Sequence, residues 1–365
     1  MRIFAIAAFL ALFAPISAYA DINIAAVGPI TGQDAPTGEQ LVRGVQAAVD
    51  AINAKGGVLG QKLNLSIKDD VCDPKQSVAI ANELAGEDVL AVVGPMCSGS
   101  AIPASKVYNE EGIITITASA TSPLLTEQGF DNVFRTCGRD DQQGDVIGAF
   151  IAKTYPGKNV AIVDDKTAFG HGLADEVRKT LNAAGIHEKL YESISRGERD
   201  YSALLSKLKE NDIGVLFYGG YHTEAGLIVR QMRDQGVDTV FVGDDDLTTK
   251  EFWSITGPAG EGALLSFSPD PRARPEAAAA VQHIRDAGYE PEGDTLYSYA
   301  AVEAIAEAIR RANSTKEQDV VKALHEGAYS TVVGDIQFDA KGDITQPGYI
   351  IYRWTKGSYI PLEGQ

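Results

Sequence analysis

The feature that most constrains the fold is an alternation, along most of the chain, between short apolar runs and longer amphipathic stretches. The runs at 21–27, 63–67 and 89–93 have the length and composition of buried strands. Between the first two, the stretch at 38–53 has apolar residues every three or four positions, as in a helix with one buried face. Strands that are separated by helices pair in parallel, because the helix makes the crossover. The alternation therefore predicts an α/β fold with parallel sheets.

The same alternation resumes in the middle of the chain and predicts a second unit of this kind. Apolar runs at 160–163, 214–218 and 239–242 are separated by further helical stretches. The chain has 365 residues, more than one hydrophobic core usually serves, so two doubly wound domains are expected. The other expected helices lie near 74–84, 101–108, 170–184, 201–209, 224–235, 276–287, 296–312 and 316–326, and the other expected strands near 113–121, 189–194, 263–267, 331–333, 336–338 and 349–354.

The N-terminal residues have the features of a secretory signal. One arginine precedes an apolar run at 3–13, and small residues at 18 and 20 form a typical cleavage site. We expect residues 1–20 to be removed, so that the mature chain begins at Asp21. The alternative, an uncleaved membrane anchor, is disfavoured because the apolar run is short. The formal net charge of −18 argues against binding to nucleic acid.

Small hydroxyl residues follow two neighbouring strands. The turn Gly94–Ser100 comes directly after the strand at 89–93 and leads into a helix that Ser98 or Ser100 can cap. The strand expected at 113–121 ends in Ser-Ala-Thr. In open α/β sheets ligands bind outside the carboxyl ends of the strands, so we expect a small carboxylate ligand here. The alternative is a capped helix after a turn, with no ligand.

Three cysteines in an exported chain allow one disulfide. Cys72 and Cys97 both follow strands at the same rim of the first sheet, so we predict that they are bonded to each other. Cys137 is then expected to be a buried free thiol. The five histidines have no metal-ligand spacing, so we predict no metal site and expect them at the surface or at helix ends, namely His171, His187, His222, His283 and His325.

Motifs of known catalytic sites are absent from the sequence, so the chain is not expected to be an enzyme. The pairs Asp69-Asp70 and Asp164-Asp165 follow strands, where such pairs usually begin turns. The run Asp244–Asp246 also follows a strand and is either a cation site or a helix cap. If it faces the same cleft as Ser98 and Thr121, the hydroxyls take a carboxylate and an aspartate takes an ammonium.

Three segments resemble the periplasmic binding proteins of branched-chain amino acid ABC transporters, the leucine/isoleucine/valine-binding family. They are Asp69–Gln76, Cys97–Ser100 with Pro103–Ser105, and Tyr218–His222. The resemblance extends over nearly the whole mature chain and implies the type I periplasmic binding protein fold, in which two doubly wound parallel-sheet lobes are joined by three hinge crossovers. The implied crossovers lie near 136–140, 265–269 and 346–349, so that lobe 1 comprises 21–138 and 268–347, and lobe 2 comprises 139–267 and 348–365.

The resemblance also implies which residues contact the ligand. Ser98 and Thr121 would bind its carboxylate, and Thr121 with the backbone carbonyl of Ser119 would take part of its ammonium. Asp245 stands where the family commonly has a glutamate for the ammonium. Phe169 and Tyr221 of lobe 2 would form walls of the pocket, and Met96 would contact the ligand's side chain. Tyr297 or Leu296 would narrow the pocket.

Two departures from the family pattern leave the ligand open. Asp245 is shorter than glutamate, and residues 35–37 lack the aromatic side chain that the family often has there. The resemblance implies a branched-chain or other aliphatic L-amino acid, with alanine, proline, γ-aminobutyrate or an amide as alternatives. It further implies a monomer in the periplasm, without a cofactor, that delivers its ligand to an inner-membrane ABC permease. A sensory receptor is the alternative partner.

Overall fold

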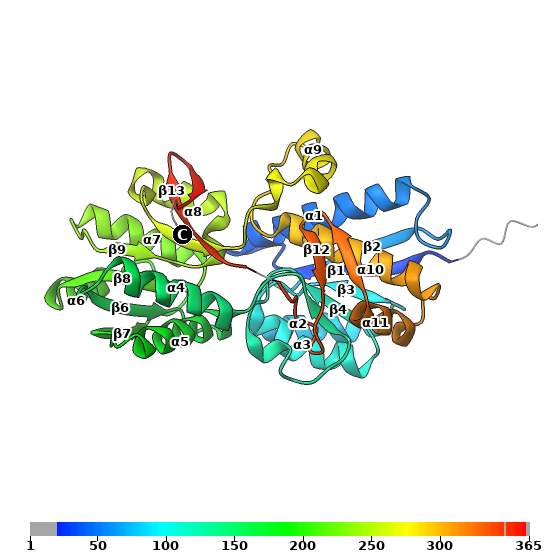
Figure 1. Cartoon of the computed structure of the whole chain (residues 1–365), viewed down its shortest axis with the longest axis horizontal. Helices are drawn as coiled ribbons and strands as arrows, with labels where there is room; N and C mark the ends of the chain where they lie inside the picture. The colour runs from blue at the N-terminus through cyan, green and yellow to red at the C-terminus, as the bar shows by residue number, and fades with distance from the viewer. Residues whose placement is uncertain (1–19, 347, 363–365) are drawn as a thin grey trace, which may run out of the picture.

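The structure, a computed structural model, describes residues 20–346 and 348–362. Two α/β lobes lie side by side along the long axis of the molecule (Figure 1). Residues 1–19 of the predicted signal segment 1–20 lie outside the described part of the chain. Within that part, no helix is both long enough and apolar enough to span a bilayer.

Lobe 1 is built on a five-stranded sheet in the order β2–β1–β3–β4–β5, with every neighbouring pair parallel. Alternate residues of β1 enter different cores: Ile24 and Ala26 belong to the main hydrophobic cluster, and Ala25 and Val27 to a smaller one. This is the period-two pattern of a sheet covered on both faces. The strands are β1 (Ile22–Gly28), β2 (Leu63–Asp69), β3 (Ala91–Val93), β4 (Ile114–Thr117) and β5 (Val133–Arg135).

Helices from two distant parts of the chain cover this sheet. The main cluster contains apolar residues of α1 and α10, and the smaller cluster contains those of α2 and α3. In Figure 1 the orange segments of lobe 1 lie among its blue and cyan ones, although the whole of lobe 2 up to β10 separates them in sequence. The elements are α1 (Ala35–Ala54), α2 (Pro74–Ala85), α3 (Ser98–Glu110), α9 (Ala278–Asp286), α10 (Thr295–Ala312) and α11 (Glu317–Glu326), with the antiparallel hairpin β11 (Ala328–Thr331) and β12 (Gly334–Gln337).

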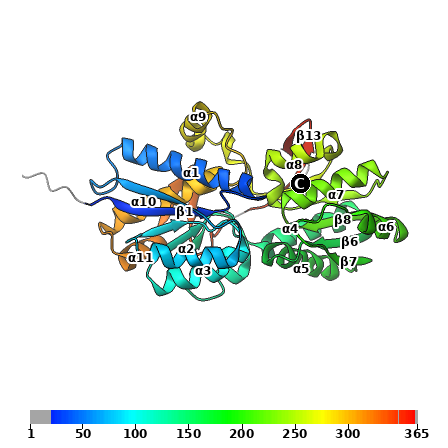
Figure 2. The same cartoon turned by 180° about the vertical axis from the view of Figure 1, so that it is seen from behind.

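Lobe 2 is built on a seven-stranded sheet in the order β14–β13–β10–β9–β8–β6–β7. Strand β13 pairs antiparallel with both of its neighbours, β10 and β14, and the other neighbouring strands pair in parallel. Seen from behind, its helices lie around the sheet at the far end from the N-terminus (Figure 2). The strands are β6 (Asn159–Asp164), β7 (Leu190–Ser193), β8 (Ile213–Gly219), β9 (Val240–Val242), β10 (Leu264–Phe267), β13 (Ile350–Thr355) and β14 (Ser358–Pro361), and the helices are α4 (Asp140–Thr154), α5 (Ala168–Ala183), α6 (Ser202–Glu210), α7 (His222–Asp234) and α8 (Lys250–Thr256).

The chain passes between the lobes three times. The passages follow β5, β10 and β12, and the red strand β13 in Figure 1 shows the last return to lobe 2. The predicted fold class, two doubly wound lobes joined by three crossovers, is confirmed. The residue boundaries given above for the lobes stay a prediction, and the last passage includes position 347, which lies outside the described residues.

Several predicted elements are wrong in extent. The strand expected at 113–121 ends at Thr117, because the Thr117 hydroxyl accepts hydrogen bonds from the backbone N–H groups of Ser119 (3.3 Å) and Ala120 (3.1 Å) and turns the chain away from the sheet. The strand expected at 331–333 lies at 328–331, and residues 332 and 333 form the hairpin turn instead. Strands β5 and β14 and helices α4 and α8 were not predicted.

Helix α4 shows why an apolar pattern can miss a buried helix. It packs on α5 through glycines: a Cβ atom built on Gly144 would lie 2.6 Å from the Cβ of Glu176, and one built on Gly148 would lie 2.7 Å from the Cβ of Thr180. A close approach of the two backbones at these glycines therefore accompanies the buried side chains of Ile147 and Ile151.

Candidate ligand-binding cleft

The predicted site residues lie where loops from both sheets meet between the lobes. Lobe 1 contributes the turn before α3 and the segment 118–122 after β4. Lobe 2 contributes the start of α5, the loop after β8 and the turn after β9. Each of these loops follows the carboxyl end of a parallel strand, which is the usual place for ligands in doubly wound sheets.

In lobe 1 the structure brings Ser98 and the segment 118–122 together. Ser98 is the first residue of α3, and its Oγ accepts a hydrogen bond from the backbone N–H of Ser122 (3.2 Å). The Thr121 hydroxyl is buried and lies beside the carboxyl of Asp140, whose pKa it lowers. Among the described residues it makes no hydrogen bond of good geometry, so it is suited to bonding a ligand placed against it.

The predicted cap of α3 is wrong. Cys97 occupies the N-cap position, and neither Ser98 nor Ser100 caps the helix. The side chain of Cys97 is instead bonded to Cys72, with the two Cα atoms 5.6 Å apart, so the predicted disulfide is confirmed. Since no side chain caps α3, its first backbone N–H groups remain available to an anion, as the sequence predicted for this turn.

The disulfide lies against lobe 2. Cys97 is buried in the hydrophobic cluster that contains Phe169 and Tyr221, and a carboxylate oxygen of Asp34 lies within 4.8 Å of both sulfur atoms. Because both thiols are oxidised, this group is a packing contact. The remaining cysteine, Cys137, is free and buried, as predicted, and burial raises the pKa of its thiol well above the usual value.

The two aromatic residues expected to form walls lie together in lobe 2. The ring centroids of Phe169 and Tyr221 are 5.5 Å apart and their planes are tilted by 52°. The guanidinium of Arg196 lies over the Tyr221 ring, 4.3 Å from its centroid, which is a cation–π contact. Arg196 was not singled out from the sequence, because nothing in its local pattern indicates which ring it covers.

Asp245 is the acid with unused binding capacity. It lies in a short 3-10 helix, Asp245–Thr248, is 8% exposed, and accepts a hydrogen bond from the Gln143 side-chain amide (2.8 Å). No Lys, Arg or His of the described residues forms an ion pair with it. Burial raises its pKa to about 7. A ligand ammonium would supply the positive charge that this carboxylate lacks.

Two further buried acids were missed by the sequence analysis. Asp294 precedes α10, and its pKa is raised well above the usual value, mainly by burial and also by the charge of Asp245. A hydrogen bond from the Ser119 side chain acts in the opposite direction and lowers this pKa. Asp140 begins α4, donates its backbone N–H to the Thr121 carbonyl (3.0 Å), and has a pKa raised to about 8 by burial. In sequence both are indistinguishable from ordinary residues at a helix start. The charge of Asp245 acts on both Asp140 and Asp294, so the candidate site is rich in carboxylates.

Met96 and Tyr297 lie in well-packed surroundings. Met96 is 2% exposed and belongs to the main core cluster with Leu41. The Tyr297 ring packs edge-on against Phe267 with centroids 5.8 Å apart, and its carbonyl accepts a hydrogen bond from the Thr136 hydroxyl (3.0 Å) beside the first crossover. Contact of either side chain with a ligand stays a prediction.

Several polar contacts join the lobes, and we call the three that involve residues 33–37 the lobe-bridging contacts. Asp34 of lobe 1 accepts two hydrogen bonds from the guanidinium of Arg196 in lobe 2 (2.6 and 2.9 Å). Gln33 donates to Glu224 (2.8 Å), and Thr37 donates to Asp246 (3.2 Å).

One of the five histidines, His222, is paired inside the protein. It begins α7, as expected for a helix-end histidine, but it is completely buried, and its Nδ1 lies 2.7 Å from a carboxylate oxygen of Asp246. Burial lowers the pKa of His222, and Asp246 more than offsets this, so the net shift is upward. The two side chains therefore form a buried hydrogen-bonded pair next to the Thr37 contact.

Comparison with known proteins assigns the family. The family model described as periplasmic binding protein matches residues 21–358. A Leu/Ile/Val-binding protein homolog from Brucella melitensis is 49% identical over 343 residues, which are 94% of this chain and 92% of the relative. Two solved structures are 26% identical and cover 93% of this chain and 97% of theirs: the leucine binding protein LivK from Thermotoga maritima, with a TM-score of 0.88, and the branched-chain amino acid binding protein LivJ from Streptococcus pneumoniae in complex with isoleucine, with a TM-score of 0.85.

Proposed function

The chain belongs to the periplasmic binding proteins, a family of binding proteins and not of enzymes, and from this premise we propose that it is the solute-binding component of an amino-acid ABC transporter. Its ligand is a branched-chain or other aliphatic L-amino acid, held between the two lobes. Leucine and isoleucine are named as ligands of its structural relatives. After export and cleavage at Asp21, the monomer would work in the periplasm and deliver the amino acid to a permease.

The observation that carries this proposal is the opposition of unlike groups across the cleft. Lobe 1 offers the Thr121 and Ser98 hydroxyls and the uncapped start of α3, which suit a carboxylate. Lobe 2 offers Asp245, which is buried without a cationic partner among the described residues and suits an ammonium. Charge-assisted hydrogen bonds at both ends would fix a zwitterion.

A smaller or non-α amino acid is the second candidate, and one observation favours it. Asp245 is one methylene shorter than the glutamate common in this family, and Gln143 already holds one of its oxygens at 2.8 Å. γ-Aminobutyrate, whose ammonium is three methylenes from its carboxylate, would then reach Asp245 without further closure, and alanine or proline would leave room for the second lobe to close further. The side chain contributes about 0.8 kcal/mol per buried methylene, so near-isosteres would be separated only weakly.

A calorimetric titration with a panel of amino acids tests the proposal. The mature protein is unfolded, dialysed and refolded to remove bound ligand, and then titrated with leucine, isoleucine, valine, alanine, proline and γ-aminobutyrate. One-to-one binding of the aliphatic set, with weak heat from the others, is the expected result. The reverse order would reassign the ligand, and silence toward every amino acid would refute an amino-acid function.

A further inference from the structure

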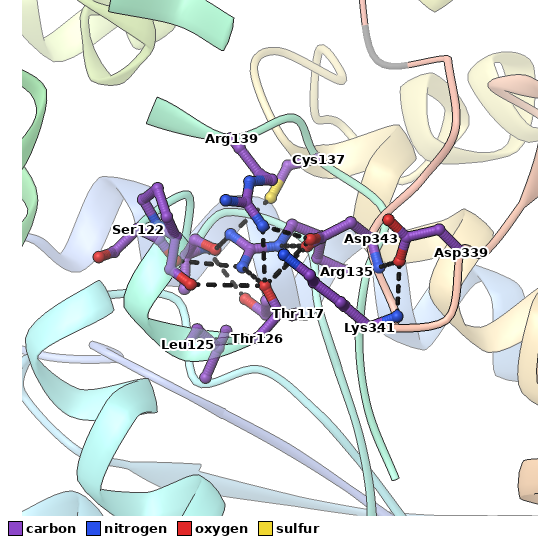
Figure 3. A network of polar contacts seen from close by, with 12 residues as sticks. Thr117, Ser122, Leu125, Thr126, Arg135, Cys137, Arg139, Asp339, Lys341 and Asp343 are labelled. Atoms are coloured by element: carbon purple, nitrogen blue, oxygen red, sulfur yellow. Dashed lines mark hydrogen bonds and ion pairs between the residues drawn. The ribbon is translucent and has the colours of Figure 1, made fainter. Parts of the chain in front are cut away.

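A buried arginine holds the segment that carries two of the proposed ligand contacts. Segment 118–122 lies outside the strand β4, so its carbonyl groups have no sheet partners. Arg135, which is completely buried, donates through Nη1 to the Ala120 carbonyl (2.8 Å) and through Nη2 to the Ser122 carbonyl (3.1 Å) (Figure 3). These two carbonyls flank Thr121, so one planar guanidinium fixes the backbone on both sides of it.

Arg135 depends on a counterion from a distant part of the chain. Its Nε lies 2.6 Å from Asp343 Oδ1, and the other oxygen of Asp343 lies 2.6 Å from Nη1 of Arg139. The Thr126 hydroxyl joins the network by accepting from Arg135 (2.9 Å) and donating to Asp343 (3.0 Å), as Figure 3 shows. A buried arginine without such a partner would be strongly destabilising, so Asp343 keeps the guanidinium in place.

The network also connects two passages between the lobes. Arg135 ends β5 and Arg139 lies just before α4, so these two residues enclose the first crossover. Asp343 lies on the last stretch of lobe 1 before the third crossover. The Arg135 backbone N–H donates to the Gly342 carbonyl (3.0 Å), and a Cβ atom on Gly342 would lie 1.9 Å from the Val133 carbonyl oxygen, so only glycine allows this close approach.

We propose that Arg135 and Asp343 are positioning residues for ligand binding. They orient Ser119 and Thr121 toward the ligand's charged groups and tie segment 118–122 to the first and third crossovers, so that lobe closure and the alignment of this segment occur together. This inference rests on the proposed amino-acid function. It adds residues that touch no ligand themselves and act through the backbone of 118–122.

Titration of the mature protein with L-leucine tests this role. Asp343→Asn removes the counterion, and Arg135→Lys removes the fork that spans the two carbonyls. Each variant is expected to bind leucine at least about tenfold more weakly, and the double variant no more weakly than the weaker single one, because both changes break one network. The matched controls are Arg285→Lys and Glu290→Gln, an ion pair (2.7 Å) on the surface of lobe 1, whose affinity should equal that of the wild type.

Hydrogen exchange gives a readout that needs no ligand. In Asp343→Asn without ligand, amides at 118–122 should exchange faster than in the wild type, while those of β6 and β8 should not change. Wild-type leucine affinity in both variants, with a lowered unfolding temperature, would show a purely structural role and overturn the proposal. If the wild type binds no amino acid, the proposed function fails, and unchanged exchange at 118–122 would overturn the positioning role separately.

Discussion

The carboxylates of Asp244, Asp245 and Asp246 take different partners although they are consecutive. Asp244 accepts hydrogen bonds from the backbone N–H groups of Gly220 (2.9 Å) and Asp246 (3.1 Å), so the predicted helix-cap role applies to this residue. Asp246 is occupied by His222. Among the described residues no cation pairs with Asp245, whose carboxylate accepts a hydrogen bond from the neutral amide of Gln143, so it is the member of the run best placed to receive an ammonium.

The raised pKa of Asp245 predicts that ligand affinity depends on pH. Only the ionised carboxylate attracts an ammonium, and its pKa of about 7 places the change between pH 6 and 8. Affinity for the amino acid should therefore fall about tenfold from pH 8 to pH 6. Titration calorimetry at several pH values measures this, with Asp245→Asn as the control that should lack this pH dependence. A flat profile for the wild type would exclude Asp245 from the ammonium site.

The same groups predict the opposite trend for the stability of the ligand-free protein. Burial raises the folded-state pKa values of Asp140 to about 8 and of Asp245 to about 7, above their values in the unfolded chain. The folded state then binds more protons than the unfolded state, so the free energy of unfolding should rise as the pH falls from 8 to 6. Urea unfolding at both pH values checks the sign. Greater stability at pH 8 would contradict the burial of these acids.

The sequence was enough to predict those site residues that follow a strand directly or that match a motif of the family. Ser98 and Thr121 follow strands at one rim of a sheet, and the structure joins their segments. The sequence was not enough to predict Asp294 or the Arg135–Asp343 pair, because more than two hundred positions separate the latter two and only the folded chain brings them together. No local pattern distinguishes such an arginine from a surface one.

At the scale of elements, the disulfide links the two loops that reach the cleft from β2 and β3. It joins residues 25 positions apart, Cys72 in the turn between β2 and α2 and Cys97 directly before α3. The alternation of apolar runs and helices was enough to predict these strands and their parallel order. It was not enough to predict where β4 ends, since that depends on the hydroxyl of Thr117 bonding to the backbone instead of the chain continuing in the sheet.

Removing the disulfide should lower both stability and affinity. The double variant Cys72→Ala, Cys97→Ala is expected to lose about 3 kcal/mol of unfolding free energy, because the loop is no longer closed in the unfolded chain. Its ligand affinity should fall as well, since Cys97 precedes Ser98 and packs with the lobe 2 aromatics. Cys137→Ala is the control, a buried cysteine without a bridge. Equal stability of the double variant and this control would refute the structural role of the bond.

At the scale of the whole molecule, the lobe-bridging contacts connect closure to the cleft. Arg196 binds Asp34 of the other lobe and at the same time covers the ring of Tyr221, one of the proposed walls. Opening the lobes would break the first contact and expose the charges of both residues to water. The closed arrangement therefore depends on a charge pair whose partners are largely buried.

Arg196→Gln should shift the protein toward an open form. The variant leaves Asp34 without a cation across the interface, so the ligand should dissociate at least about tenfold faster than from the wild type. Stopped-flow measurement of ligand release and the radius of gyration from solution scattering check this, with a larger radius expected. Arg178→Gln, on the exposed surface of lobe 2, is the control. Release and radius equal to those of the control would show that the pair does not hold the lobes together.

The measurement that tests the account most directly compares L-leucine with 4-methylpentanoate, the same molecule without its amino group. The account predicts that leucine binds one-to-one to the mature protein and that the analogue binds roughly a hundredfold more weakly, because the buried carboxylate of Asp245 would then lack its cation. In Asp245→Asn this preference should largely disappear. Equal affinity of the wild type for the two molecules would contradict recognition of an amino-acid zwitterion between the lobes.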